Sequence, residues 1–364
     1  MLLSAFTFSQ KKEGTEQITY FIKYNISNQK IIDSIFLKNR KNERLLRLLI
    51  KKSKENSYLE GEFYGSNALG RYYRDLSLFD KSIYEYKNAL LVSRKKKDTI
   101  SEIKTLNAIG SVYRRQDDIR NALNYHQEAL DKATTIKNPK TTTKKSISIA
   151  QNSIGNIYLS LKQYELALKE FKKAMVFQKQ LNHTRGIAIN YKCFGDAYEG
   201  LGDLDEALKN YQKSLNYNTQ INSTIGKVIC GYNIANVLIK QKKYNQALKT
   251  VDTILQLAIQ EKDMFYLSST YNTLGLAQLH SNKLQSAKKS LTAALEIAKK
   301  FNIHSIIVKA NENLSFLFAK REDFKKAYSY YRKSKEENIK TLNDKNLMYV
   351  GELITKYDRE RSEN

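Results

Sequence analysis

Apolar residues recur every three or four positions along most of this chain, with polar residues between them. Between residues 148 and 181, apolar positions recur every three or four residues on both sides of the short polar connection LKQY. That spacing places the apolar side chains on one face of an α-helix. The pattern predicts two amphipathic helices, about Ser148–Leu161 and Tyr164–Leu181, joined by a tight turn.

The same helix pair recurs with a fixed period. Small residues recur 40 residues apart, with one spacing of 45, at Gly70, Gly110, Gly155, Gly195, Ala235, Gly275 and Ser315. Twelve residues after each of them stands a second small residue: Ser82, Ala122, Ala167, Ala207, Ala247, Ala287 and Ala327. A fixed period of about 20–50 residues indicates a solenoid. Because small residues let two helix axes approach closely, we expect Gly155 to meet Ala167 where the paired helices cross.

This pattern resembles the tetratricopeptide repeat, in which a small residue at position 8 meets a small residue at position 20. The longer period of this chain resembles the variants in kinesin light chains and in Rap-type peptide receptors. The resemblance implies an all-α, right-handed superhelical solenoid of about seven helix-turn-helix repeats with N- and C-terminal capping helices. It also implies a concave groove lined by the first helix of each repeat.

Four segments follow from this interpretation. Residues 1–14 are either the remnant of a signal peptide or a disordered N-terminus, so an extracytoplasmic and a cytoplasmic location both stay open. Residues 15–61 form an N-terminal helical cap or degenerate repeat, with one helix at Lys41–Asn56 and another within Thr15–Asn39. The seven repeats occupy residues 62–338, and residues 339–364 form a capping or connector helix. The stretch Thr134–Ser146, which holds the only proline, is predicted to be a long polar loop.

Composition narrows the class of protein. The formal net charge is +25, but the lysines are scattered along predicted helix surfaces, whereas a nucleic-acid interface requires a clustered basic stripe. No apolar run approaches the roughly 18 residues of a membrane span. The two cysteines, Cys193 and Cys230, and the four histidines lack metal-site spacing, so we expect neither a metal nor a cofactor. We expect buried free thiols, although pairing in an oxidising compartment stays open.

No catalytic signature is present in the sequence. The chain lacks a phosphate-binding GxxxxGK[ST] loop, a GxGxxG turn, an HExxH zinc motif and a GxSxG nucleophile elbow. We therefore predict a binding protein and not an enzyme.

The candidate binding residues lie on the predicted groove face, at positions 5, 9 and 12 of the first helix of each repeat. They are Asn67, Arg71, Arg74, Asn107, Arg114, Asn152, Asn156, Lys192, Asn236 and Asn272. A carboxamide offers both a donor and an acceptor, so a ladder of asparagines is suited to clamp the backbone of an extended peptide. The alternative is that these residues are simply polar groups on a solvated face. Arg71, Arg74 and Arg114, with Arg115 beside them, predict a basic pocket for an acidic part of the ligand towards repeats one and two.

Three functions remain open at this point. The first is a scaffold that grips an extended protein or peptide segment in its groove. The second is the sensory region of a bacterial signalling protein, a histidine kinase or transcription regulator, whose output part lies outside this chain. The third is nucleic-acid binding through the basic surface.

Overall fold

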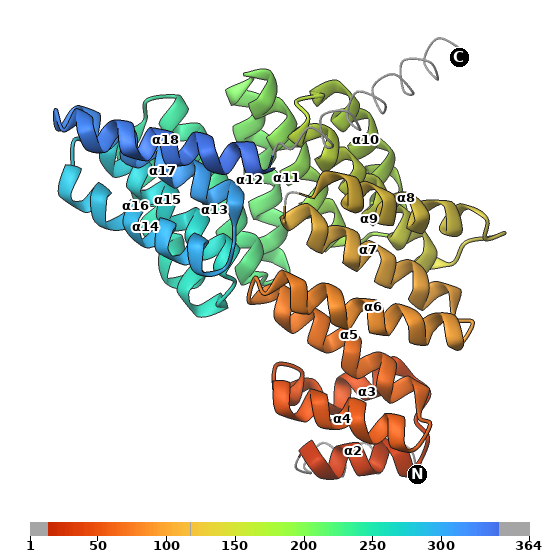
Figure 1. Cartoon of the computed structure of the whole chain (residues 1–364). Helices are drawn as coiled ribbons and strands as arrows, with labels where there is room; N and C mark the ends of the chain where they lie inside the picture. The colour runs from red at the N-terminus through yellow and green to blue at the C-terminus, as the bar shows by residue number, and fades with distance from the viewer. Residues whose placement is uncertain (1–13, 117, 342–364) are drawn as a thin grey trace.

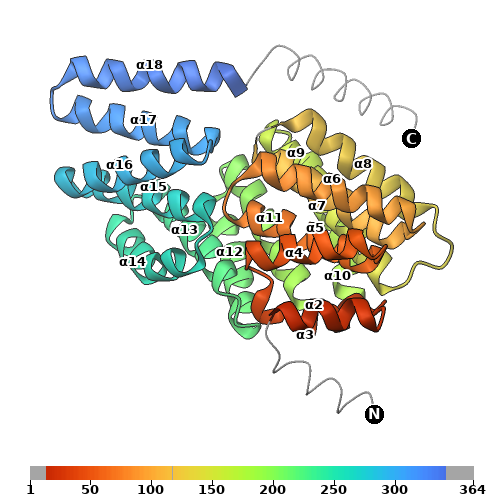
Figure 2. The same ribbon diagram turned by 60° about the horizontal axis from the view of Figure 1, so that its bottom comes forward.

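Paired antiparallel helices dominate the computed structural model, which describes residues 14–116 and 118–341 (Figure 1). Within these residues every regular element is a helix: there are 17 α-helices and one 3-10 helix, and no strand. Consecutive pairs stack on one another along a curved path that leads from the N-terminal helices to α18 (Figure 2). The predicted all-α repeat solenoid is confirmed.

Seven helix pairs form the array, here called repeats 1 to 7. Their first helices are α5 (Leu59–Asp75), α7 (Thr99–Arg115), α9 (Thr141–Ser160), α11 (Thr184–Leu201), α13 (Thr224–Lys240), α15 (Met264–His280) and α17 (His304–Lys320). Their second helices are α6 (Phe79–Lys95), α8 (Ile119–Thr134), α10 (Tyr164–Gln180), α12 (Leu204–Gln220), α14 (Tyr244–Glu261), α16 (Leu284–Lys300) and α18 (Phe324–Thr341).

Short turns with left-handed backbone join the helices. In the predicted connection LKQY, Lys162 has a φ of 59°, and Ser77 and Lys242 occupy the same place in other repeats with φ values of 59° and 62°. A single left-handed residue ends a helix because it redirects the chain while its neighbours satisfy the last carbonyl groups. Several of the next helices begin at a capping side chain, such as Asp203, which accepts a hydrogen bond from the Glu206 amide at 3.0 Å.

The first small residue of several repeats makes room for an aromatic side chain where the two helices of the repeat cross. A Cβ atom added at Gly155 would lie 2.4 Å from Cε1 of Phe171, and its three nearest atoms all belong to that ring. Gly70 faces Tyr86 and Gly195 faces Tyr211 in the same way. The glycine therefore makes room for a large side chain four residues beyond the second small residue. The two small residues also meet in repeat 1, where Ser82 Oγ donates a hydrogen bond to the Gly70 carbonyl at 2.7 Å.

Four short elements precede the array: α2 (Gly14–Lys23), α3 (Gln29–Ile35), η1 (Leu37–Asn39) and α4 (Glu43–Glu55). The predicted helix at Lys41–Asn56 corresponds to α4, whereas the region expected to hold one helix holds α2, α3 and η1. Phe21, Phe36 and Leu46 are fully buried in a core that these elements share with α5. The N-terminal elements therefore continue the packing of the array.

The loop that holds the proline is shorter than the loop predicted at Thr134–Ser146. Residues 135–140 connect α8 to α9, but α9 already begins at Thr141 and is 20 residues long. Thr143 and Ser146 are buried within the first two turns of α9, so the extra residues lengthen a helix as well as a loop. Of the N-terminal segment 1–14, predicted to be a signal remnant or disordered, residues 1–13 lie outside the described residues, as do residues 342–364 of the capping or connector helix predicted at 339–364.

Candidate functional site

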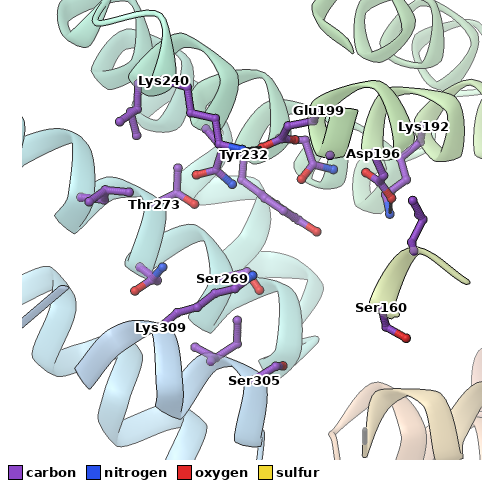
Figure 3. A pocket seen from close by; sticks show the side chains of 18 of the residues that line it. Ser160, Lys192, Asp196, Glu199, Tyr232, Lys240, Ser269, Thr273, Ser305 and Lys309 are labelled. Carbon is purple, nitrogen blue, oxygen red and sulfur yellow. Dashed lines mark hydrogen bonds and ion pairs between the residues drawn. The ribbon is translucent and has the colours of Figure 1, made fainter. Parts of the chain in front are cut away.

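A cavity of about 670 Å³ lies among the first helices of repeats 3 to 7, with Arg114 from the end of α7 at its wall (Figure 3). The side chains that line it come mainly from positions 2, 5, 6, 9, 12 and 13 of those helices, counted so that the small residue is position 8. These positions form one helix face. The contribution moves along the helix from repeat to repeat: α9 lines the cavity with its C-terminal half, at Asn156, Leu159 and Ser160, and α17 with its N-terminal half, at Lys309, Glu312 and Asn313.

Two lysine–carboxylate pairs and a tyrosine hydroxyl form a connected network on the α11 side of the cavity. Lys192 Nζ lies 2.5 Å from Asp196 Oδ2, and Lys240 Nζ lies 2.8 Å from Glu199 Oε1. Between the two carboxylates is the buried Tyr211 hydroxyl, 2.8 Å from each. Burial raises the pKa of Tyr211, and the two carboxylates raise it further. Burial lowers the pKa of Lys192, but the charge of Asp196 outweighs this and the net pKa is raised, so Lys192 stays protonated.

Two donor groups in the cavity wall lack an acceptor. Arg114 Nε and Asn233 Nδ2 are buried and form no hydrogen bond with any described residue. Leaving a buried donor unpaired costs about 1–3 kcal/mol. Asn236, which is half-buried in the same wall, likewise forms no side-chain hydrogen bond within residues 14–116 and 118–341. These three residues can therefore donate to a bound acceptor without breaking an existing contact.

Five of the ten predicted binding residues line this one cavity: Arg114, Asn156, Lys192, Asn236 and Asn272. Asn272 is 8% exposed, and its Oδ1 accepts a hydrogen bond from Asn313 Nδ2 at 3.0 Å. The structure therefore brings together residues spread over 159 positions of sequence.

Two of the predicted binding asparagines, Asn152 and Asn107, do not line the large cavity. Asn152 is 6% exposed and exchanges hydrogen bonds with Asn190 of the next repeat, at 3.2 and 2.9 Å. Asn107 is 3% exposed, donates to the Ser146 carbonyl at 3.2 Å and faces His126 Nδ1 at 2.9 Å. Their amides are used between helices of the scaffold, so neither is available as a clamp for a ligand. The repeat spacing did not distinguish these two residues from ligand contacts, because a side chain at position 5 can face the neighbouring repeat as well as the groove.

The remaining predicted residues are not gathered into one basic pocket. Arg71 and Asn67 line a second, smaller cavity, and Arg114 lines the large one. Arg74 is paired with Asp75, with Nη2 at 2.6 Å from Oδ1. The predicted single pocket of Arg71, Arg74 and Arg114 is therefore not formed, because Arg71 and Arg114 line different cavities and Arg74 is held by Asp75.

Arg115 joins two parts of the array that are far apart in sequence. Its Nη1 lies 3.2 Å from Asp263 Oδ2, and the two side chains are only 13% and 8% exposed. The guanidinium group also lies over the rings of Phe265 and Tyr266, 5.6 and 5.2 Å from their centroids. The end of α7 in repeat 2 is thereby tied to the start of α15 in repeat 6.

Position 6 was missed by the sequence analysis. It contributes Asn233, Thr273 and Asn313 to the wall of the large cavity. The same 40-residue period that identified position 5 relates these three residues. Position 6 lies between positions 2 and 9 on a helical face, so the signal was present in the repeat alignment.

Among the described residues no group of three or more His, Cys, Asp or Glu side chains is placed to hold a metal ion. In that part of the chain, no helix combines the length and apolar character needed to cross a membrane. Cys193 and Cys230 are buried free thiols, and burial raises the pKa of Cys193 to about 11, which keeps the thiol protonated.

Stacked helix pairs with small residues at a fixed period define a helical-repeat scaffold. The family model of the tetratricopeptide repeat matches residues 64–135, 146–220 and 227–300, more than half of the chain. The chain belongs to the tetratricopeptide repeat family. A comparison with curated protein sequences found no match.

Solved structures with the same fold include Rap proteins. The crystal structure of a Rap protein complexed with competence and sporulation factor has a TM-score of 0.66 and 19% identity, over 90% of this chain and 91% of that chain. The Rap conjugation gene regulator of the plasmid pLS20, in complex with the Phr* peptide, gives 0.66 and 16%, over 80% and 77%. Aspartyl phosphate phosphatase F from Bacillus subtilis gives 0.58 and 16%, over 85% and 75%. At these identities the likeness concerns the fold.

Proposed function

We propose that this protein is a binding scaffold, and not an enzyme, that holds an extended protein or peptide segment in the large cavity. The observation that carries the proposal is the cavity wall, which offers two buried donors without acceptors, Arg114 Nε and Asn233 Nδ2. An extended peptide presents a carbonyl acceptor at every residue. A bound main chain would satisfy these donors, whereas an apolar ligand would leave them unpaired.

The size and charge of the cavity fit the same ligand. Pockets of about 300–1,000 Å³ hold ligands of drug size, so 670 Å³ accommodates a segment of a few residues. Two lysine–carboxylate pairs neutralise each other on the α11 side. Arg114 forms no ion pair within the described residues. We therefore propose that a carboxylate of the ligand lies at the Arg114 end.

One of the similar structures holds a peptide: the Rap conjugation gene regulator of the plasmid pLS20 is in complex with the Phr* peptide. Another Rap protein is complexed with competence and sporulation factor. The peptide complex supports a peptide as the class of ligand for this chain. The particular sequence recognised here must follow from its own cavity.

Peptide selection tests the proposal. A random peptide library displayed on phage is selected against the full chain, and the affinity of the selected peptides is measured by calorimetry. Asn236→Ala removes an unpaired amide from the wall, so we expect about tenfold weaker binding, the equivalent of one hydrogen bond of about 1.4 kcal/mol. Arg114→Gln should reduce affinity most for peptides with acidic residues.

Asn245→Ala is the matched control, because Asn245 is an exposed asparagine on α14 that does not line the cavity. It should bind the selected peptides as the unaltered protein does. The proposal is refuted if no peptide is selected, or if Asn236→Ala and Arg114→Gln bind the selected peptides with unchanged affinity.

A further inference from the structure

A second cavity, of about 290 Å³, lies between the N-terminal part of the array and the beginnings of α11 and α13. Its wall includes Arg40 and Lys41 next to η1, Arg71 on α5, and Arg185 in the first turn of α11. Residues from three distant segments of the sequence thus meet around one small space. The function proposed for the large cavity does not involve any of them.

The positive charges in this wall are unpaired. None of the four basic side chains lies within 4.0 Å of a carboxylate oxygen of any described residue, although both acidic residues of the wall, Asp33 and Asp75, are near. Asp75 is already paired with Arg74 at 2.6 Å. Asp33 accepts a hydrogen bond from the Tyr64 hydroxyl at 2.9 Å.

Four exposed cations and two carboxylates line this wall, so its net charge is positive, and like charges on neighbouring side chains repel. The start of α11 adds to the positive potential, since a helix N-terminus carries about half a positive charge. Its capping residue, His183, makes no side-chain hydrogen bond to the first-turn amides. An anion at this place would be favoured by the side chains and by the helix end together.

We propose that this second cavity is a binding site for a compact, multiply charged anion of phosphate size. Three of its four cations are arginines, whose planar guanidinium groups make paired hydrogen bonds to the oxygens of a phosphoryl group or carboxylate. The space of 290 Å³ equals roughly ten water molecules, which suits a single anionic group and excludes a nucleic-acid helix. The anion connects α5 in repeat 1 with α11 in repeat 4.

Calorimetric titration of the full chain with inorganic phosphate, at an ionic strength held constant with chloride, tests this site. We expect saturable phosphate binding that is at least fivefold weaker in Arg71→Gln and in Arg185→Gln. Arg332→Gln is the control, because it removes the same charge from an exposed arginine on α18. Circular dichroism verifies that each variant is folded.

A parallel titration with succinate distinguishes the sources of the anion. Binding of phosphate alone assigns the site to phosphoryl groups, and binding of both assigns it to acidic side chains as well. No saturable binding of either anion refutes the proposal, as does an equal weakening by Arg332→Gln. Asn236→Ala should leave phosphate binding unchanged, so failure of the peptide site and failure of this site can be told apart.

Discussion

Acidification should destabilise this protein through one buried histidine. His126 on α8 is fully buried beneath Gly110, where the corresponding residues of repeats 1 and 3 are Tyr86 and Phe171. Asn107 uses its Nδ2 to donate to the Ser146 carbonyl, so its Oδ1 must accept from His126 Nδ1. The imidazole is therefore neutral, with a lone pair on Nε2 that has no partner among the described residues.

Burial, reinforced by the charge of Arg114, lowers the pKa of His126 from 6.5 to about 3. The unfolded chain then binds one proton more than the folded chain between these two values, so stability falls as the pH falls. Each pH unit in this window costs about 1.4 kcal/mol. Acidification from pH 6.5 to pH 5 should therefore lower the free energy of unfolding by about 2 kcal/mol through this residue alone.

Urea unfolding at several pH values, followed by circular dichroism, measures the effect. His126→Phe removes the titrating group and should flatten the slope by about 1.4 kcal/mol per pH unit between pH 6 and pH 4. The two proteins are compared by the slope of unfolding free energy against pH. His126→Phe also leaves Asn107 Oδ1 without its donor, but this cost is the same at every pH and does not change the slope. Equal slopes for the two proteins would refute the reasoning, as would an NMR titration in which the His126 ring protonates near pH 6.5 in the folded state.

Two further predictions concern contacts within the scaffold. Gly155→Ala should lower the free energy of unfolding by about 1–2 kcal/mol, because the clash with Phe171 exceeds the gain of about 1 kcal/mol in helix propensity. The loss should be smaller when Phe171 is also replaced by leucine. An equal loss with Phe171 and with leucine at this position would contradict this packing. Asn152→Leu should cost about 2 kcal/mol because it leaves the buried Asn190 amide partly unpaired, whereas Asn152→Leu with Asn190→Leu should cost less than the sum of the single changes. Strict additivity in urea unfolding would rule out that coupling.

Local patterns predicted the repeats because every copy satisfies the same packing requirement. A small residue such as Gly155 must recur wherever a large side chain fills the crossing of two helices, so its register is visible in the sequence. The beginning of α9 was not predicted, because the polar residues from Thr141 to Ser146 carry no apolar stripe. Of these residues Thr143 and Ser146 are buried, and the Ser146 carbonyl accepts a hydrogen bond from Asn107 of the preceding repeat, a contact that local periodicity does not reveal.

The binding face was predicted only in part. Positions 5, 9 and 12 of a first helix do project towards the groove, which is why Asn156, Lys192 and Asn236 meet in one cavity. Whether an amide at such a position stays free depends on the neighbouring repeat, and the hydrogen bond between Asn152 and Asn190 illustrates this. Arg71 and Arg114 line different cavities. The position of each arginine within its own repeat does not reveal this.

The contact between Arg115 and Asp263 has a consequence for how the chain unfolds. In a linear array each repeat touches only its neighbours, so unfolding can begin at either end and advance one unit at a time. Here a hydrogen bond spans 148 residues and joins repeat 2 to repeat 6. Repeats 2 to 6 therefore form a closed loop of interactions, in which opening any one member weakens contacts on both sides of the ring. These five repeats are expected to unfold as one cooperative block.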